Sequence, residues 1–316
     1  MNLLGIIMFG KLLSPKQMVT KDFPSLNVNT SVFDAATIEE TFISSESVTY
    51  GQYKNIKYAQ SNDLVFGCIE AEQLDNISLD AVAHEVYLSL FDLIAKYGYN
   101  YLVRVWNYVP NILEEENGME RYRRFNCGRH EAFVSKNHGV EQSPAANCVG
   151  VPEGPLSVYF LACKRPGIPL ENPRQTSAYR YPQQYGPRSP TFSRATLTEL
   201  NGTPLLFISG TASVVGHESL HPDDVLEQTR ETMTNIEILL EQAAKENFMA
   251  AKDGLYLKVY IKYSEHFSLI KNYLETLNKP AAHQIVYMQC DLCRPELLVE
   301  IEGFCLPLTS NKQVNK

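Results

Sequence analysis

The order of apolar patterns in the last third of this 316-residue chain constrains its fold most strongly. Runs rich in β-branched and aromatic residues, typical of strands, alternate there with segments whose apolar residues repeat at helical spacing. The predicted order is strand 203–213, helix 222–247, strand 255–263, helix 264–277, strand 283–291 and strand 296–304. This order predicts an α+β domain, because neither an all-helical bundle nor an all-strand sandwich alternates in this way.

The long helix 222–247 carries the clearest local signals. Its expected buried face consists of Val225, Thr229, Met233, Ile236 and Leu240. Pro222, followed by two aspartates, is typical of a helix start, because proline lacks the amide hydrogen that would be unpaired there and acids favour the helix N-terminus.

The first half of the chain is less regular. It contains the pattern of a strand at 63–70, a helix at 79–98 that ends at a glycine, and strands at 101–110 and 156–164. Residues 117–150 have the character of a cation-rich loop, 166–190 are proline-rich and irregular, and 1–60 show no clear pattern. We therefore expect a two-domain α+β chain, with a divergent N-terminal domain over 1–150 and a C-terminal domain over 151–316.

Arginine is distributed unevenly in this acidic chain, whose formal net charge is −8. Nine of the twelve arginines lie between Arg121 and Arg194, and the stretch "YRYPQQYGPRSPTFSRAT" (179–196) interleaves them with tyrosines and prolines. Guanidinium groups match carboxylates bidentately and phenols add hydrogen bonds, so the cluster predicts a pocket for a small carboxylate ligand. The alternative is that these arginines pair with the 36 acidic residues. The net charge argues against a nucleic-acid partner.

Other sequence features exclude further classes of protein. The seven cysteines are odd in number and scattered, which predicts reduced thiols in a cytoplasmic protein. Cys290 and Cys293 form a single CxxC without a second ligand pair, so we expect no metal site. The apolar run 1–13 lacks a preceding cation and a following cleavage site, which predicts no secretory signal. No apolar run approaches the ~20 residues that a membrane span needs.

Motifs in the last third resemble the YjgF/RidA superfamily: "LLFISGTAS" (205–213), "EQTRETMTNIEILL" (227–240) and "CRPELLVEIEG" (293–303). The resemblance implies a mixed sheet packed by two helices. Deaminases of that superfamily carry a carboxylate-binding arginine on the strand before the last, whereas 282–289 here contains none. The upstream motifs "RVWNYVPNI" (104–112), "GMERYRRFNCGR" (118–129) and 179–196 make the chain resemble the chorismatases, which join a divergent N-terminal domain to a YjgF-like one.

The chorismatase resemblance implies roles for individual residues. Glu300 would be the acid that protonates the enolpyruvyl methylene of chorismate, and the substrate-binding positions are Tyr122, Arg129, Tyr181 and Arg194. Cys293 would favour the hydroxybenzoate-forming branch, and Ala212 would shape the same pocket wall. From the residues alone, Glu300 and Glu302 share one face of the closing strand with Leu298 and are equal candidates, although a solvent-facing strand glutamate fits Glu302 better. His217 fits either acid–base chemistry or helix capping.

The expected function is therefore that of a cofactor-free chorismatase that releases pyruvate and forms a hydroxybenzoate, with the 3-hydroxy isomer as the main product. The alternatives are a chorismate hydrolase that gives a dihydroxycyclohexadiene carboxylate, an enamine/imine deaminase of the YjgF/RidA type, and a non-enzymatic ligand-binding module. We expect a monomer or small homo-oligomer whose site lies between the two halves of one chain.

Overall fold

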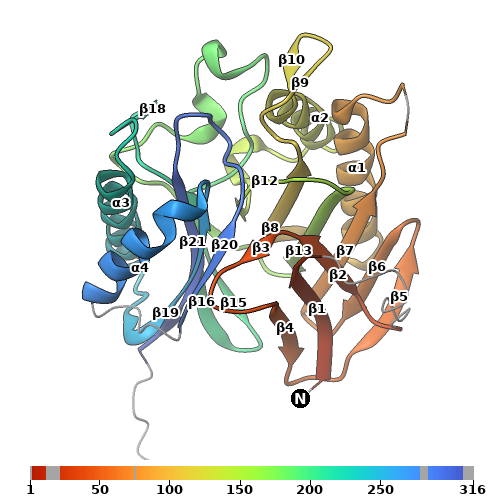
Figure 1. The fold of residues 1–316 in the computed structure, drawn as a ribbon. Helices are drawn as coiled ribbons and strands as arrows, with labels where there is room; N and C mark the ends of the chain where they lie inside the picture. Colours follow the sequence, from red (N-terminus) through yellow and green to blue (C-terminus); the bar gives the residue numbers. More distant parts are fainter. Residues whose placement is uncertain (1, 12–21, 75, 278–283, 309–316) are drawn as a thin grey trace, which may run out of the picture.

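The computed structural model describes residues 2–11, 22–74, 76–277 and 284–308 and has an α+β architecture (Figure 1). The helices are α1 (Leu79–Tyr97), α2 (Arg121–Ser135), α3 (Val225–Lys245) and α4 (Phe267–Thr276). The strands are β1 (Asn2–Gly10), β2 (Ser25–Asn29), β3 (Ser31–Val32), β4 (Ile38–Ser44), β5 (Thr49–Tyr53), β6 (Ile56–Gln60), β7 (Leu64–Ala71), β8 (Tyr101–Pro110), β9 (Glu115–Glu116), β10 (Met119–Glu120), β11 (Ala145–Ala146), β12 (Val149–Val151), β13 (Leu156–Cys163), β14 (Ile168–Leu170), β15 (Ala195–Leu200), β16 (Thr203–Thr211), β17 (Val214–Val215), β18 (Glu218–Ser219), β19 (Ala250–Ile261), β20 (Ile285–Gln289) and β21 (Val299–Pro307).

The N-terminal sheet has the strand order β11-β8-β13-β7-β6-β5, and β12 also pairs with β8. Helices α1 and α2 cover its outer face (Figure 1). Helix α1 ends at Gly98 in the left-handed conformation, with φ of 78°, as the glycine at this place predicts. The strands β7, β8 and β13 and helix α1 thus confirm the expected elements in this half to within about one residue.

The C-terminal sheet has the order β14-β15-β16-β21-β19-β20-β3. It is mixed, because β19 and β20 run parallel while the pairs around them are antiparallel. Helices α3 and α4 pack on its outer face (Figure 1). The Asp224 side chain caps α3 by accepting hydrogen bonds from the amides of Leu226 and Glu227 at 3.1 and 3.0 Å. The expected mixed sheet with two helices is confirmed.

The inner faces of the two sheets meet, so the helices lie on opposite sides of the molecule (Figure 1). The shared core contains Trp106 and Tyr159 from the N-terminal sheet and Phe207, Tyr260 and Met288 from the C-terminal sheet. A smaller sheet, β2-β1-β4, adds apolar side chains to the same core. Because β21 is a central strand, every second side chain on it points into this interface.

Some expectations from the sequence about secondary structure were wrong. Residues 117–150 are not a loop throughout, since they contain α2, whose buried face carries Phe125, Arg129 and Phe133. The many arginines of this segment obscure its apolar pattern in the sequence. Helix α2 lies so close to α1 that a Cβ at Gly128 would overlap the carbonyl of Asp80. The closing strand begins at residue 299 rather than 296, so the alternation predicted for the preceding residues fails.

The sheets cross the predicted domain boundary. Strand β13 lies between β7 and β8, so the N-terminal sheet includes residues up to Cys163. Strand β3, from the N-terminal part of the chain, pairs with β20 of the C-terminal sheet. The division at residue 150 stays a prediction. Residue 283, at the start of the predicted strand 283–291, and residues 1, 12 and 13 of the first apolar run lie outside the described residues. Within the described residues, no helix has both the length and the apolar character required to cross a membrane.

Candidate active site

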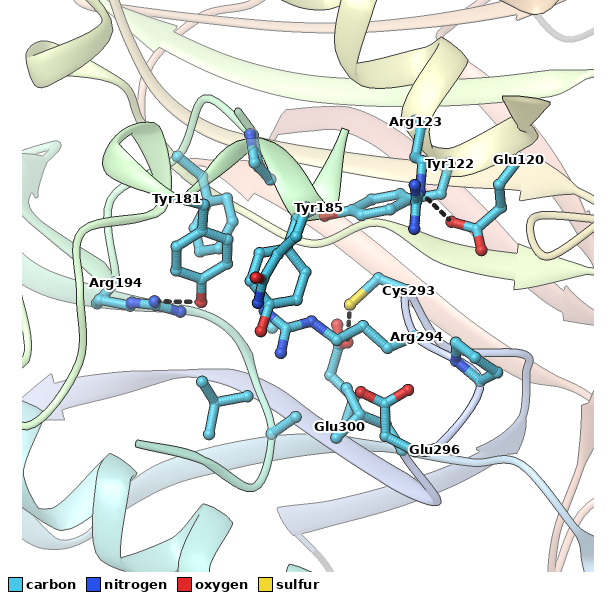
Figure 2. Close-up of a pocket in the computed structure, with 18 residues that line it drawn as sticks. Glu120, Tyr122, Arg123, Tyr181, Tyr185, Arg194, Cys293, Arg294, Glu296 and Glu300 are labelled. Atoms are coloured by element: carbon cyan, nitrogen blue, oxygen red, sulfur yellow. Dashed lines mark hydrogen bonds and ion pairs between the residues drawn. The ribbon is translucent and has the colours of Figure 1, made fainter. Parts of the chain in front are cut away.

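A cavity of about 370 Å³ lies between the two halves of the chain (Figure 2). Its walls come from α2, the 181–194 segment, the end of β16 and the 293–300 segment. The lining residues are Glu120, Tyr122, Arg123, Tyr181, Gln184, Tyr185, Pro190, Phe192, Arg194, Gly210, Ala212, Val214, Cys293, Arg294, Pro295, Glu296, Leu297 and Glu300. Loops after strands and the first turn of a helix thus bring together residues that are far apart in sequence.

Glu300 lies at the base of this cavity and is almost fully buried, with 4% of its surface exposed. Burial, together with the nearby Glu302 carboxylate, raises the pKa of Glu300 to about 8, although the Arg104 guanidinium acts in the opposite direction. The carboxyl is therefore mostly protonated at neutral pH. Gly210 makes room for it, because an added Cβ there would overlap Oε1 of Glu300. A protonated carboxyl that faces a cavity is suited to general acid catalysis.

Glu302 is also buried, so the expectation of a solvent-facing glutamate was wrong. Its carboxylate forms an ion pair with Arg104 and another with Lys258 at 3.0 Å. The Tyr260 hydroxyl donates a further hydrogen bond at 2.6 Å. These partners occupy both oxygens and leave Glu302 outside the main cavity lining. Glu302 therefore serves as a counterion within the core.

The residues before β21 do not continue its alternation. Leu298 packs in the helix-covered core with Val299 and Ile301, whereas Leu297 lines the cavity and joins the core between the sheets. The prediction that Leu298 shares a face with the two glutamates was therefore wrong. The chain enters β21 only at residue 299, and a period of two applies only to extended backbone within a strand.

Most of the clustered arginines pair with acids, which is the alternative that the sequence left open. Six ion pairs join the cluster to acidic residues: Arg121 to Glu116, Arg123 to Glu120, Arg124 to Asp80, Arg165 to Glu199, Arg174 to Glu231 and Arg180 to Glu141. Arg129 and Arg194 form no ion pair with any described residue, although both are almost fully buried. The two arginines that the resemblance singled out are thus among those left available for a ligand.

Arg194 is held at the cavity wall. Its Nη2 donates hydrogen bonds to the Thr176 carbonyl and to the Tyr181 hydroxyl, both at 2.8 Å. Figure 2 shows the contact between Arg194 and Tyr181. Arg129 lies over the ring of Tyr87, with its guanidinium carbon 5.0 Å from the ring centre. Its Nε and Nη2 have no hydrogen-bond partner among the described residues.

Arg129 lines a second, small cavity of about 30 Å³ that adjoins the main one. The two cavities share six lining residues: Tyr122, Pro190, Phe192, Gly210, Cys293 and Glu300. Each of the seven residues predicted for the site therefore lines one or both cavities: Glu300, Tyr122, Arg129, Tyr181, Arg194, Cys293 and Ala212. The carboxyl of Glu300 thus lies where the two spaces meet.

Cys293 lies next to the candidate acid. Its Sγ is 4.0 Å from Oε2 of Glu300, and burial, followed by the influence of Glu300, raises the pKa of this thiol to about 12. The thiol is therefore neutral and fills space beside the carboxyl. Burial also raises the pKa of Tyr122 well above its ordinary value, so its phenol remains a hydrogen-bond donor.

Sequence reasoning missed several residues of the cavity, above all Arg294, Tyr185 and Gly210. Arg294 stands apart from the arginine cluster, although it follows Cys293 directly. The glycine within the strand pattern of "LLFISGTAS" was a usable signal, because glycine inside a strand often marks a close approach. His217 is not among the described lining residues and instead shares a hydrogen bond with Tyr185, 3.3 Å between Nδ1 and the hydroxyl.

Among the described residues, no group of three or more His, Cys, Asp or Glu side chains is arranged so that it could bind a metal ion. Cys290 and Cys293 are both free thiols.

Comparison with known proteins identifies the family. The family model described as "Chorismatase FkbO/Hyg5-like, N-terminal" matches residues 40–162. The chain is 33% identical to a 3-hydroxybenzoate synthase of Streptomyces hygroscopicus, over 96% of this chain and 91% of that protein. It is 34% identical to a chorismatase of Streptomyces rapamycinicus, over 89% and 86% of the two chains. A chorismatase crystal structure superposes with a TM-score of 0.86 at 29% identity and covers 96% of this chain and 93% of that one. Similarity of this extent over nearly the whole chain shows that this protein belongs to the chorismatase family of enzymes.

Proposed function

We propose that the protein converts chorismate into 3-hydroxybenzoate and pyruvate. One observation of the site carries the proposal: Glu300, a buried carboxyl that is mostly protonated at neutral pH, shares a cavity with buried guanidinium groups that lack carboxylate partners. The names of the related proteins, a 3-hydroxybenzoate synthase and chorismatases, support the choice of substrate and product. They do not favour a deaminase or a non-enzymatic binding module.

Chorismate is a dianion with one carboxylate on its ring and one on its enolpyruvyl side chain. Arg129 and Arg194 neutralise these charges, and the phenols of Tyr122 and Tyr181 add hydrogen bonds. A buried charge without a partner costs several kcal/mol, so a bound dianion would offset the cost of burying these two guanidinium groups. The combination of a neutral acid and cations therefore fits a dicarboxylate whose reacting carbon lies near Glu300.

The reaction begins when Glu300 protonates the terminal methylene, which becomes the methyl group of pyruvate. The neighbouring ring hydroxyl captures the resulting oxocarbenium ion and gives up its proton. The bond between this oxygen and the ring then breaks, so that it becomes the ketone oxygen of pyruvate. The bond between the pyruvyl carbon and the original ether oxygen breaks as well, and the ether oxygen stays on the ring as the 3-hydroxyl and takes up the released proton. Loss of one ring hydrogen as a proton restores aromaticity and returns a proton to Glu300, so no water is consumed. Cys293 favours this route over hydrolysis because its uncharged thiol occupies space beside the acid that a water molecule would otherwise fill.

The experiment is to incubate the purified protein with chorismate, measure pyruvate with a lactate dehydrogenase assay, and separate the ring products by chromatography. We expect equal amounts of pyruvate and 3-hydroxybenzoate. A non-aromatic diol as the only ring product would overturn the proposed product but not pyruvate release. Absence of pyruvate at any enzyme concentration would overturn the proposed function.

We also propose that the protein acts in the cytoplasm as a monomer or small homo-oligomer. All seven cysteines are free, which is typical of a reducing compartment. The residues proposed for catalysis and binding come together within one chain, which supports the proposal that each copy carries its own site. Mass measurement of the purified protein by light scattering, with activity assayed across the same concentrations, tests the second statement.

A further inference from the structure

Arg294 lies in the wall of the main cavity, outside the cluster of arginines between Arg121 and Arg194. It is buried, and its guanidinium lies over the ring of Tyr185, 4.1 Å from the ring centre, and near the ring of Tyr181, at 5.3 Å. Figure 2 shows its side chain reaching beneath Tyr185 on the side of the cavity where Glu300 lies. Two aromatic faces therefore fix the plane of this guanidinium.

Hydrogen bonds fix the position of Arg294 as well. Its Nη1 donates to the His217 carbonyl at 2.9 Å and to the Ser219 hydroxyl at 3.0 Å. The Ser219 hydroxyl donates in turn to the Glu296 carboxylate at 2.7 Å. The His217 ring also shares a hydrogen bond with Tyr185, whose ring stacks on Arg294. One nitrogen of the guanidinium thus holds the side chain in place, and the other two donate no hydrogen bond to a described residue.

The charge of Arg294 is not balanced by a direct partner. Arg123, another arginine of the cavity wall, forms an ion pair with Glu120 at 3.8 Å. Arg294 forms no ion pair with any described residue, and Glu296 reaches it only through the Ser219 hydroxyl. Since a buried guanidinium without a carboxylate is costly, this arrangement is suited to an anionic ligand.

The segments that hold Arg194 and Arg294 are joined to each other. The Thr176 carbonyl accepts a hydrogen bond from Arg194, and the Thr176 amide donates one to the Gly216 carbonyl, in the β17–β18 turn that precedes His217, at 2.7 Å. Both guanidinium groups also flank Tyr181, with distances of 5.7 and 5.3 Å to its ring centre. The positions of the two guanidinium groups are therefore linked through Thr176, the β17–β18 turn and the ring of Tyr181, and such prior positioning favours binding of a carboxylate.

We propose that Arg294 binds one carboxylate of the dicarboxylate substrate, and that His217 acts as a positioning residue for Arg294 through Tyr185. The inference rests on the proposed function for the identity of the substrate. It adds a binding residue outside the clustered arginines and assigns a role to His217 that involves no proton transfer to the substrate.

The first test uses a non-reacting probe, 3-(carboxymethoxy)benzoate, which carries a ring carboxylate and an ether-linked carboxylate. Its dissociation constant is measured by calorimetry for the wild type, for Arg294→Ala and for Arg294→Lys. We expect Arg294→Ala to weaken binding about 10- to 100-fold, because a charge-assisted hydrogen bond is lost. Lysine should restore little of this affinity, because it lacks the planar fork.

Arg230→Ala is the matched control, because Arg230 also lies over a tyrosine ring, that of Tyr273 at 5.5 Å, but on the exposed side of α3. It should bind the probe as the wild type does. An Arg294→Ala variant that keeps the wild-type melting temperature and binds the probe within about twofold of the wild type overturns the inference. The binding assay does not depend on turnover, so failure of the wild type to release pyruvate from chorismate overturns only the proposed function.

The second test separates positioning from proton transfer at His217. His217→Ala should raise KM severalfold with kcat nearly unchanged, and His217→Asn should restore KM, because its amide can still bind the Tyr185 hydroxyl. Tyr185→Phe should raise KM to about the same value as His217→Ala. The double variant with Tyr185→Phe and His217→Ala should raise KM no further, because each substitution removes the same contact. A fall of kcat by about 100-fold or more in His217→Ala, the size expected for a lost proton-transfer group, overturns the positioning role.

Discussion

Glu300 and Glu302 lie two residues apart on the same face of β21, yet their surroundings differ completely. Glu300 faces a cavity, has no charged hydrogen-bond partner among the described residues and has a raised pKa. Glu302 is surrounded by Arg104, Lys258 and Tyr260, which bind both of its oxygens. The same residue type on one strand therefore supplies a neutral acid at one position and a core counterion at the other.

The difference shows that partners, not burial, separate the two glutamates, since both are almost fully buried. Glu302 even contributes to its neighbour, because its negative charge raises the pKa of Glu300. The ion pairs thus hold the Glu302 carboxylate at a fixed position near Glu300, where its charge favours the protonated form of Glu300. The following predictions test this contrast, from the largest expected effect to the smallest.

Exchanging each glutamate for glutamine should separate the two roles. Glu300→Gln keeps the size of the side chain but removes the donated proton, so kcat should fall about 100- to 10,000-fold while the melting temperature changes little. Glu302→Gln should instead cost about 3 to 5 kcal/mol of unfolding free energy, because Arg104 and Lys258 lose their buried partner. Steady-state kinetics and denaturant titration decide the matter. Near-normal turnover in Glu300→Gln would show that Glu300 is not the acid.

The proposed carboxylate-binding arginines should affect binding more than chemistry. Arg129→Ala or Arg194→Ala should each raise KM for chorismate by about 10- to 100-fold, since a charge-assisted contact is lost. Arg165→Ala, which removes an exposed ion pair with Glu199, is the control and should leave KM unchanged. An unchanged KM in both test variants would remove these residues from the site.

Gly210→Ala should disturb Glu300 without touching Glu302. The added methyl group overlaps Oε1 of Glu300 and forces the carboxyl to move, and a misplaced acid loses about tenfold or more in kcat. Gly139→Ala is a suitable control, because no atom lies within 4 Å of a Cβ at that position. Full activity in Gly210→Ala would mean that the position of the Glu300 carboxyl is not critical.

The pH dependence should report the raised pKa of Glu300. Because this pKa is about 8, the acid form predominates below pH 8 and is lost above it. We expect kcat/KM to fall about tenfold per pH unit on the alkaline side. A pH-rate profile from pH 6 to 10 measures this. A profile that begins to fall near pH 5 would place an ordinary, ionised carboxylate at this position.

Cys293→Ala should have the smallest effect, on product choice rather than on rate. The variant opens space 4.0 Å from the Glu300 carboxyl, where water can compete with the ring hydroxyl for the oxocarbenium ion. Part of the product should therefore shift from 3-hydroxybenzoate to the diene diol, while total pyruvate changes by less than about threefold. Chromatography of the products of the wild type and of Cys293→Ala under identical conditions gives the ratio of 3-hydroxybenzoate to diol. An unaltered ratio would leave Cys293 as a packing residue only.

The sequence predicted the regular parts of this structure well where periodicity was strong. The apolar face of α3 was visible because Val225, Met233 and Ile236 recur at helical spacing. Helix α2 was not predicted, since arginines separate its buried Phe125 and Phe133 and its mean composition is polar. A helix whose buried face includes a charged residue such as Arg129 cannot be recognised from an apolar pattern alone.

The site was predicted mainly through resemblance, and physical reasoning contributed the arginine cluster. Reasoning from alternation placed Glu300 and Glu302 on one face but could not separate them, because the partners of Glu302 come from β8 and β19. Arg294 was missed for a similar reason: its tyrosine neighbours lie over a hundred positions earlier in the chain. Contacts of this kind arise only from the tertiary fold.

The short strand β3 has a consequence for how the chain assembles. It covers the open edge of β20, and the Thr30 hydroxyl lies 3.5 Å from the Cys290 thiol, 260 positions further along the chain. Contacts between such distant positions raise contact order and slow folding. During synthesis, β3 therefore cannot pair with β20 until nearly the whole chain has left the ribosome. Expression of the C-terminal half alone would leave β20 as a bare edge, a known template for aggregation.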